Sequence, residues 1–476
     1  MEKTKIKIGY APTRRNVFSA EDAGSHKNQI LEFIKQYDAE IIDINDINQE
    51  GLLFDYSDVD KVVKKFTEAG VDGLFFPHCN FGSEFLVGMV ASKIDKPVLL
   101  WGPRDDAPLP SGERTRDTQC GLFATGKVLR RFNVPFTYIV NSKVEDNVFV
   151  NGYNSFLGVC AVVKAFKKIR ILQISTRPSD FWTMISNEGE LLEKFGVQTF
   201  PITLPDVERG VKNLINENGP EFQKNYAVVT SSFDCSKISA DAVNSIVGLK
   251  TLINQYCEEK QCTAVAIQCW TSLQSVLGIM PCVANGILTE EGIPVVCETD
   301  LHGAISAIML QEANRRASAI FFADLTIRHP ENDNAELLWH CGNFAPSLIK
   351  EGEMATIEHN FIMPEHCPGI GNFEIRGGDM TICRFDGDHG KYSLLIGEGR
   401  GVDGPKNLGT WVWFEVKDWP KWEEKIVTGP YVHHCAGVHG KVAPILHEAC
   451  KYIPGIAPDP VEPSADDISA FWRSND

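Results

Sequence analysis

The chain has 476 residues, of which 43% are hydrophobic and 23% are charged. This is the composition of an ordinary globular protein, and the length predicts two to four domains. The formal net charge of −17 argues against nucleic acid or an anionic membrane as the main partner, because both require a basic surface.

The beginning of the chain shows no targeting segment. Residues 1–10 pass directly into an alternating strand pattern without an apolar signal core. We find no stretch that approaches the ~18–20 apolar residues of a membrane span. The 14 cysteines are scattered and none forms a Cys-x-x-Cys spacing, which favours reduced, buried thiols over a disulfide framework or a zinc site. We therefore expect a cytoplasmic protein.

The first third of the chain alternates strand and helix patterns. Strands are expected at Lys5–Gly9, Gly73–Phe76 and Val98–Trp101, with helical patterns between them, one of which ends at Gly70. Repeated β–α units predict a parallel sheet with helices on both faces.

A second series of the same kind begins near residue 168. Its expected strands are Ile169–Ile174, Thr199–Leu204, Ala227–Thr230 and Thr263–Gln268, and the longest helical pattern between them is Ser239–Glu259. Two successive α/β domains of about 160 residues agree with ordinary domain sizes.

After about residue 345, glycines, aromatic residues and β-formers dominate the chain. The expected strands are Phe373–Arg376, Met380–Arg384, Tyr392–Ile396 and Thr410–Val416. A helical pattern near Lys441–Lys451 follows them.

The predicted fold class is therefore α/β. Two doubly wound parallel-sheet domains, at residues 1–167 and 168–345, precede a mainly antiparallel β domain at residues 346–476.

Two carboxylates follow the apolar strand pattern that begins at Ile293. Catalytic side chains of open α/β sheets lie at the carboxyl ends of strands, so Glu298 is well placed for a site. The alternative is that these residues cap the helix expected at Gly303–Gln311, and Asp300 fits that role better than Glu298 does.

A further apolar strand pattern, Ala319–Asp324, ends in one carboxylate. If the two strands are neighbours, Glu298 and Asp324 meet at one sheet edge, where they repel unless a cation or a proton lies between them. Carboxylate oxygens suit Mg²⁺ or Mn²⁺. A loop aspartate without a ligand is the alternative.

Histidine is concentrated late in the chain, since ten of the twelve lie at or beyond His302. Three of them, His433, His434 and His439, fall in a run of small residues that indicates a turn. An imidazole beside two carboxylates makes a nitrogen and oxygen site that favours Mn²⁺ or a similar ion over structural zinc. Purely structural histidines are the alternative.

These three features, in this order, resemble the L-fucose isomerase family, with the L-arabinose isomerases as more distant relatives. The matching residues are Glu298, the Asp324 of Phe-Ala-Asp-Leu, and the His439 of Gly-Val-His-Gly. The resemblance implies that these three bind Mn²⁺, or another divalent cation such as Mg²⁺ or Co²⁺, and that Glu298 and Asp324 exchange protons with a sugar. Other similar segments are Gln268–Thr271, Ile396–Gly399, Cys79–Gly82 and Trp101–Arg104.

The resemblance leaves the role of His340 open. His340 lies sixteen residues after Asp324, about where the L-arabinose isomerases have a metal-binding histidine. It is therefore either a fourth ligand or a group behind the ligands.

The resemblance also implies a homo-oligomer, often a trimer or hexamer, in which a neighbouring first domain completes the pocket. Arg104, in an arginine-rich loop after Trp101, is the candidate for that contribution, although salt bridges within the loop are the alternative. Candidate sugar contacts are Gln268, Trp270, Trp339 and Trp101, although core packing is the commoner role of a tryptophan.

The implied activity interconverts an open-chain aldose and its 2-ketose through a metal-stabilised enediolate, with a hydride shift as the other route. The substrate is then a monosaccharide such as L-fucose, D-arabinose, L-arabinose, or a C6-modified hexose such as sulfoquinovose. Two alternatives stay open: a cytosolic sugar-binding or regulatory protein, and another sugar metalloenzyme such as an aldolase.

Overall fold

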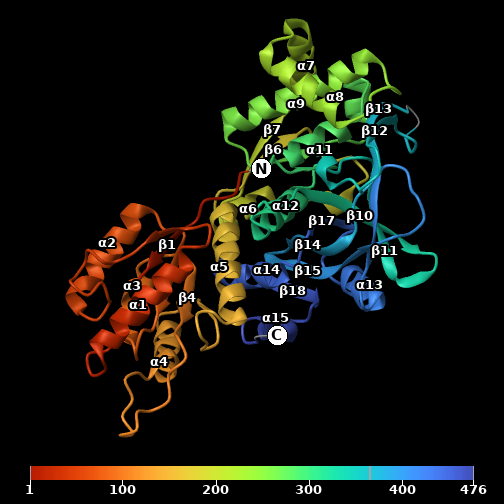
Figure 1. Cartoon of the computed structure of the whole chain (residues 1–476). Helices are drawn as coiled ribbons and strands as arrows, with labels where there is room; N and C mark the ends of the chain where they lie inside the picture. The colour runs from red at the N-terminus through yellow and green to blue at the C-terminus, as the bar shows by residue number, and fades with distance from the viewer. Residues whose placement is uncertain (1, 364–365, 475–476) are drawn as a thin grey trace. The chain divides into compact units, whose positions relative to one another are not determined.

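The computed structural model describes residues 2–363 and 366–474. The chain forms two compact units (Figure 1). We call residues 4–164, 447–454 and 465–474 the N-terminal unit, and residues 2–3, 165–446 and 455–464 the C-terminal unit.

The N-terminal unit contains a five-stranded parallel sheet with the order β2-β1-β3-β4-β5. The strands are β1 (Lys7–Tyr10), β2 (Glu40–Ile42), β3 (Gly73–Pro77), β4 (Val98–Trp101) and β5 (Thr137–Tyr138). The helices are α1 (Ala20–Ile34), α2 (Val59–Ala69), α3 (Glu84–Ser92), α4 (Thr118–Arg131), α5 (Asn147–Phe166) and, from the end of the chain, α15 (Ala465–Phe471).

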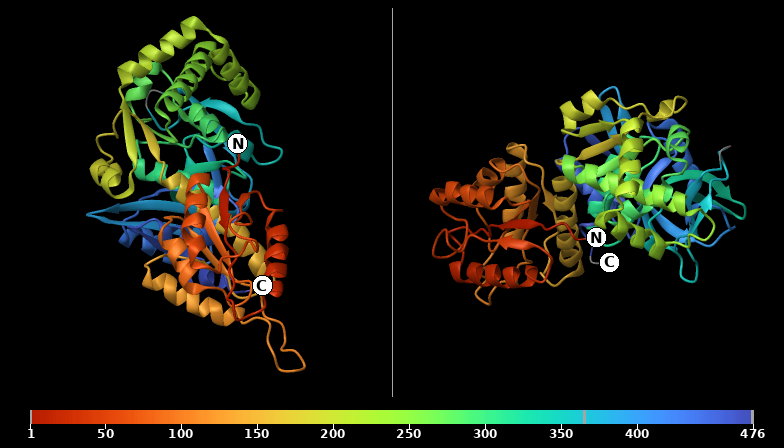
Figure 2. Two further views of the ribbon diagram at one scale, coloured as in Figure 1. Left: turned by 90° about the vertical axis from the view of Figure 1, so that its left-hand side faces the viewer. Right: turned by 90° about the horizontal axis from the view of Figure 1, so that it is seen from above.

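Both faces of this sheet are buried, as the near-continuous apolar strands predict. Phe75 belongs to a core with α1 and α5, while its neighbours Leu74 and Phe76 belong to a core with α2, α3 and α4. This alternation follows from the two-residue repeat of a strand. The right-hand view of Figure 2 shows helices on both sides of this sheet.

Helix α5 corrects one expectation. It is the one helix among the described residues that is long and apolar enough to cross a membrane, whereas the sequence analysis found no such stretch. However, 72% of its most apolar window is buried, and Phe149, Tyr153 and Phe156 pack in the core of the N-terminal unit. A buried core helix accounts for these properties.

The C-terminal unit begins with a four-stranded parallel sheet with the order β7-β6-β8-β9. Its strands are β6 (Arg170–Ile174), β7 (Gln198–Ile202), β8 (Ala264–Ile267) and β9 (Val295–Val296). Its helices are α6 (Glu188–Phe195), α7 (Leu204–Glu217), α8 (Pro220–Ser232), α9 (Ala240–Lys260), α10 (Ser272–Leu277), α11 (Cys282–Glu290) and α12 (Leu301–Ala313).

The strand predicted at Ala227–Thr230 is wrong, because these residues lie within helix α8. Pro220 occupies the first turn of that helix, where its missing N–H costs nothing. Phe222, Asn225 and Val229 are its buried residues, and their spacing is helical.

A nine-stranded sheet completes this unit, with the order β12-β13-β16-β11-β10-β17-β14-β15-β18. All described pairings in it are antiparallel except β13–β16 and β15–β18. The strands are β10 (Ile320–His329), β11 (Asn332–His340), β12 (Thr356–His359), β13 (Pro368–Glu374), β14 (Gly378–Asp388), β15 (Lys391–Val402), β16 (Thr410–Glu415), β17 (His434–His439) and β18 (Ile456–Glu462). Helix α13 (Trp419–Thr428) precedes β17, and α14 (Ala443–Ala449) follows it.

The predicted fold class is confirmed, since two parallel α/β sheets precede a mainly antiparallel sheet. The antiparallel sheet starts earlier than expected, because β10 and β11 belong to it although they precede residue 346. Asp324 therefore lies inside β10 and not at the end of a strand of the parallel sheet.

The predicted turn around His433–Gly440 is wrong, because His434–His439 forms strand β17 between β10 and β14. Small residues are required there by packing. A Cβ atom on Gly437 would lie 2.2 Å from the ring of Phe321, which faces it across the β10–β17 pair. Glycine thus marks a close approach inside a strand.

Strand β11 carries a buried carboxyl group with a testable pH effect. Burial raises the pKa of Glu336, which is 5% exposed, to about 7, although Arg328 opposes the shift. A raised carboxyl pKa favours the folded state below the ordinary pKa, and this contribution is lost as the pH rises through 7. We expect the free energy of unfolding of Glu336→Gln, measured against that of the wild type, to be higher at pH 8.5 than at pH 5.5 by on the order of 1–3 kcal/mol. Thermal melts of both proteins at the two pH values measure this, and an equal difference at both would contradict it.

Candidate active site

Glu298 lies just beyond β9 on unusual backbone. Glu298 and Thr299 both have positive φ angles, 54° and 56°, a region that only a few per cent of non-glycine residues adopt. The next residue, Asp300, caps helix α12, since its Oδ1 accepts a hydrogen bond of 2.8 Å from the Gly303 N–H. Asp300 is therefore the capping carboxylate, and Glu298 is not needed for the cap.

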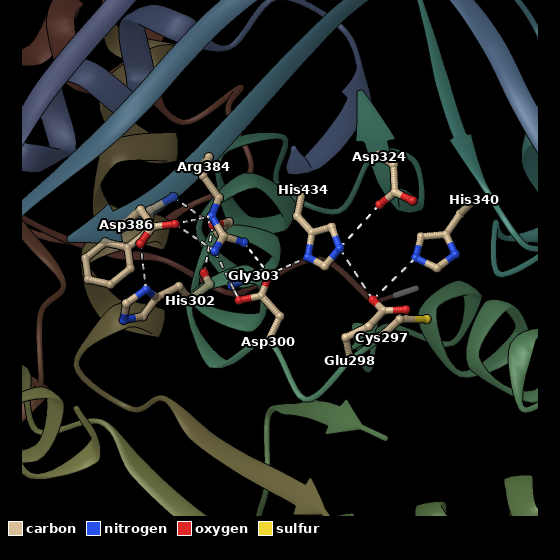
Figure 3. Close-up of polar contacts among 12 residues, drawn as sticks. Cys297, Glu298, Asp300, His302, Gly303, Asp324, His340, Arg384, Asp386 and His434 are labelled. Atoms are coloured by element: carbon tan, nitrogen blue, oxygen red, sulfur yellow. Dashed lines mark hydrogen bonds and ion pairs between the residues drawn. The ribbon is translucent and has the colours of Figure 1, made fainter. Parts of the chain in front are cut away.

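Four side chains from separate strands converge on one point (Figure 3). His434 Nε2 lies 3.4 Å from Glu298 Oε2 and 3.3 Å from Asp324 Oδ1. His340 Nε2 lies 3.8 Å from the same Glu298 oxygen. The sheet register explains the convergence, because Asp324 on β10 faces His434 on β17, and β11 ends at His340 beside β10.

The converging atoms lack ordinary partners. Within the described residues, Glu298 Oε2, Asp324 Oδ1 and His340 Nε2 are all buried without a hydrogen-bond partner. Buried polar atoms in that state are costly, and two carboxylates together are costlier still. A divalent cation between Glu298, Asp324 and His434 would remove this cost, and its oxygen and nitrogen donors suit Mn²⁺, Mg²⁺ or Co²⁺.

His434 is oriented as a cation ligand. Its Nδ1 lies 2.9 Å from Asp300 Oδ2, an acceptor, so in the neutral ring Nδ1 carries the proton and the Nε2 lone pair is left for a cation. Burial alone would lower the pKa of His434, but the Asp300 hydrogen bond and the nearby Asp324 and Glu298 raise it overall.

A buried ionic chain holds Asp300 in turn. The Arg384 guanidinium pairs with Asp300, and its Nε donates 2.8 Å to Asp386, whose other oxygen lies 2.9 Å from His302 Nδ1. Arg384 is 1% exposed. Burial would raise the pKa of Asp300, but Arg384 and His434 hold it far below its ordinary value. Asp300 therefore stays ionised and fixes the His434 ring.

His340 has the opposite orientation. Its Nδ1 accepts a hydrogen bond of 2.9 Å from the Cys341 N–H, so in the neutral ring the proton lies on Nε2 and points towards Glu298. Burial would lower the pKa of His340, but Asp324, the Cys341 contact and Glu298 raise it well above its ordinary value. This geometry fits a proton donor beside the ligands better than a fourth ligand.

The structure does not bring His439 to this cluster. It lies at the far end of β17, five residues from His434, or about 17 Å along the strand. Its Nε2 lies 2.8 Å from the carbonyl oxygen of Arg376 and donates to it. His434, which belongs to the same histidine-rich run, occupies the place that the resemblance assigned to His439.

The segment after β8 borders the cluster. Cys269 Sγ donates to Glu298 Oε1 at 3.0 Å, and burial holds the pKa of this thiol well above its ordinary value, so it remains a donor. Gln268 Oε1 accepts from Ser175 Oγ at 2.7 Å, and the Trp270 ring packs 5.6 Å from that of Phe181. Gln268 and Trp270 thus lie beside the residue that positions Glu298.

Trp339 lies next to His340, and their rings are nearly parallel with centroids 6.2 Å apart. It lines a groove of about 660 Å³ together with Phe361, Ile327 and Leu408. Its indole N–H donates 2.6 Å to the Leu408 carbonyl oxygen. Trp339 therefore lies between His340 and this groove.

The two candidates in the N-terminal unit have structural roles within it. Trp101 is buried, donates 3.0 Å to Ser142 Oγ and packs 4.1 Å from the Phe149 ring. Arg104 is exposed, and its carbonyl oxygen accepts a hydrogen bond from Arg116. Arg116 also pairs with Asp106. This is a salt bridge within the loop, as the alternative role for these arginines predicted.

Comparison with known proteins finds sugar isomerases at both ends of the chain. Residues 9–167 match the N-terminal domain of fucose and sulfoquinovose isomerases, and residues 338–456 match the C-terminal domain of L-fucose isomerase. The sulfoquinovose isomerase of Priestia aryabhattai is 24% identical over 396 residues, which cover 83% of this chain and 85% of that protein. The sulfoquinovose isomerase of Alkalicoccus urumqiensis is 26% identical over 384 residues, 79% of this chain and 83% of that protein.

Among solved structures, an ABC transporter periplasmic solute binding protein from Actinobacillus succinogenes 130z with bound D-allose aligns over 66% of this chain and 94% of that one. Its TM-score is 0.17 at 12% identity, which is too low to indicate a shared fold. The two matched domains, in contrast, cover more than half of the chain. The chain therefore belongs, as a divergent member, to the L-fucose isomerase family of aldose–ketose isomerases.

Proposed function

We propose that this isomerase depends on a divalent cation held by Glu298, Asp324 and His434, and that its substrate is a hexose with an anionic group at C6. The observation that supports the cation is the convergence of Glu298 Oε2, Asp324 Oδ1 and His434 Nε2, the first two of which are buried without hydrogen-bond partners. The relatives named sulfoquinovose isomerase support the substrate class.

A cation in this site would act as a Lewis acid on the oxygens at C1 and C2 of the open-chain sugar. Glu298 is ionised, since His340 and His434 lower its pKa although burial would raise it. It can therefore accept the C2 proton and return it to C1. The Cys269 thiol donates to Glu298 Oε1 and so holds this carboxylate in place.

The second proton transfer needs a group that can serve the sugar hydroxyls. Asp324 is the more accessible carboxylate, with a side chain 19% exposed against 4% for Glu298. His340 directs its Nε2 proton into the same space. We assign to Asp324 the transfer of a proton between the sugar oxygens O1 and O2. His340 is the neighbouring proton donor.

Arg177 is our candidate for the anionic group. It lies in the loop after β6, where its Nη1 donates to the carbonyl oxygens of Pro178 and Ser179. The same loop packs Phe181 against Trp270, next to Cys269. Within the described part of the chain no carboxylate pairs with this guanidinium, so it is available to a sulfonate.

We expect Arg177→Gln to raise KM for sulfoquinovose by about 10–100-fold, because a charge-assisted hydrogen bond contributes about 1.5–3 kcal/mol. Turnover of any neutral hexose that the enzyme accepts should change little. Arg209→Gln, an exposed arginine on α7 of the same unit, is the matched control. An equal KM effect on charged and neutral sugars would contradict the assignment.

The function itself is tested with cation-stripped protein reloaded with Mn²⁺. The protein is incubated in D₂O with sulfoquinovose, L-fucose, D-arabinose, L-arabinose and glucose, and NMR follows the signals of C1 and C2. Cation-dependent interconversion of sulfoquinovose with deuterium uptake at C2 is the expected result. Turnover without added cation, or cleavage of the carbon chain as by an aldolase, would overturn the proposal.

The assembly follows from the resemblance, and the location from the scattered cysteines. We propose a cytoplasmic homo-oligomer, a trimer or hexamer, and light scattering of the purified protein measures its mass in solution.

A further inference from the structure

A second group of donor atoms lies on the other side of Glu298. The sulfurs of Cys269 and Cys297 and a carboxylate oxygen of Glu298 all lie within 4.8 Å of one another, and all three residues are buried. Glu298 Oε1 accepts from the Cys269 thiol at 3.0 Å, whereas Oε2 faces His434 and His340. Figure 3 shows the Cys297 sulfur beside the Glu298 carboxylate.

The fold places these thiols together. Cys269 follows β8 and Cys297 follows β9, and these strands are parallel neighbours in the sheet. Their carboxyl ends therefore meet at one edge. Further sulfur surrounds the pair, because Cys282, Cys341 and Met280 share an apolar cluster, and Cys282 interacts electrostatically with Cys269.

Two side-chain amides are aimed at the Cys297 sulfur. Asn343 donates to it at 3.6 Å and Asn285 at 3.9 Å, and both asparagines are buried. Their own Oδ1 atoms are buried and have no hydrogen-bond partner among the described residues. Amide N–H donors that converge on a sulfur stabilise negative charge there, as they do around metal-bound thiolates.

We propose that Cys269, Cys297 and Glu298 Oε1 form a second cation site, which takes a thiophilic divalent cation such as Zn²⁺ or Cd²⁺. Soft sulfur ligands select such ions, whereas the site of Glu298 Oε2, Asp324 and His434 has only oxygen and nitrogen donors. Two sulfurs and one oxygen make three ligands and leave a fourth position open. On binding, the cation replaces the two thiol protons, which pass to solvent, and no electrons are transferred.

The two sites would share one carboxylate, since Oε1 of Glu298 serves the thiol site and Oε2 the other. A cation on the thiols therefore fixes the group that we assign to the C2 proton. This consequence for catalysis rests on the proposed function, but binding at the thiols does not, and it is measured without any sugar.

The test is a titration of the full-length, reduced protein with Cd²⁺ after its oxygen and nitrogen site has been filled with Mn²⁺. Thiolate coordination gives an ultraviolet charge-transfer band that oxygen and nitrogen ligands do not give. We expect one equivalent of Cd²⁺ to produce this band and to release two protons. Cys269→Ser and Cys297→Ser should each weaken Cd²⁺ binding by at least about tenfold and diminish the band, by loss of one ligand.

Cys262→Ser is the matched control, because Cys262 is also buried but precedes β8 at the opposite end of the strand, beside Cys257. The band should survive this change. Absence of the band in the folded wild-type protein, or its loss in Cys262→Ser and retention in Cys297→Ser, would overturn the proposal. Circular dichroism establishes folding, and Cys297→Ala replaces any serine variant that does not fold.

Discussion

Glu298→Gln is expected to lower kcat by about 10²–10⁴-fold, which is the usual contribution of a positioned acid or base. The amide keeps the shape of the side chain and can still accept from the Cys269 thiol, but it cannot take up the C2 proton. Cation affinity should fall as well, because one charged ligand is lost. Initial rates with saturating Mn²⁺ separate the two effects.

The stability of this variant provides an internal check. Although burial opposes the shift, His340 and His434 lower the pKa of Glu298, so its charge contributes stability at neutral pH, and its removal should lower the melting temperature of the cation-free protein. Glu336→Gln, which neutralises another buried carboxyl group of the same unit, is the control and should retain its kcat. A fall in kcat of less than tenfold in Glu298→Gln at saturating cation would contradict the assigned role.

Arg384→Met is expected to lower the free energy of unfolding by about 3–5 kcal/mol, because it leaves two buried carboxylates without their counter-charge. Arg384 is buried between Asp300 and Asp386, and it pairs with both. Methionine fills most of the space, so lost packing contributes little to the effect. Urea unfolding of the wild type and the variant at pH 7.5 measures the difference.

The matched control is Arg400→Met, an exposed arginine on the neighbouring strand β15, which should cost less than about 0.5 kcal/mol. The loss in Arg384→Met should shrink as the pH falls, because protonation of the two carboxylates removes the unpaired charge. A loss that does not change with pH would show that packing, and not the ionic chain, stabilises this region.

Local sequence patterns were sufficient for several parts of the site. The apolar run before Glu298 and the helix after Asp300 predicted both a strand-end carboxylate and a helix cap, and Asp300 is the cap. The β–α repetition likewise predicted the parallel sheets, because buried parallel strands are apolar throughout. These features depend on neighbours in the sequence.

Features that depend on pairing between distant strands were not predictable in the same way. Asp324 was expected at the end of a parallel strand, whereas β10 pairs with β17 and β11 in the antiparallel sheet. That pairing places Asp324 opposite His434. Nothing within ten residues of Asp324 specifies this partner.

The distance of His439 from Glu298 and Asp324 was not predictable for a related reason. Glycine and alanine in this run indicate a turn, in which both histidines would lie close together. In the structure the glycine at 437 accommodates the Phe321 ring inside a strand, and the strand separates the two histidines by its full length. The signal available in the sequence was the His433–His434 pair itself, whose second histidine lies five residues before His439.

The most direct test of this account is Mn²⁺ binding by His434→Asn and His439→Asn, measured by electron paramagnetic resonance of free Mn²⁺. If His434 completes the site with Glu298 and Asp324, His434→Asn binds Mn²⁺ at least about 100-fold more weakly and His439→Asn binds it like the wild type. Wild-type Mn²⁺ affinity in His434→Asn together with lost affinity in His439→Asn would contradict this account and identify His439 as the ligand.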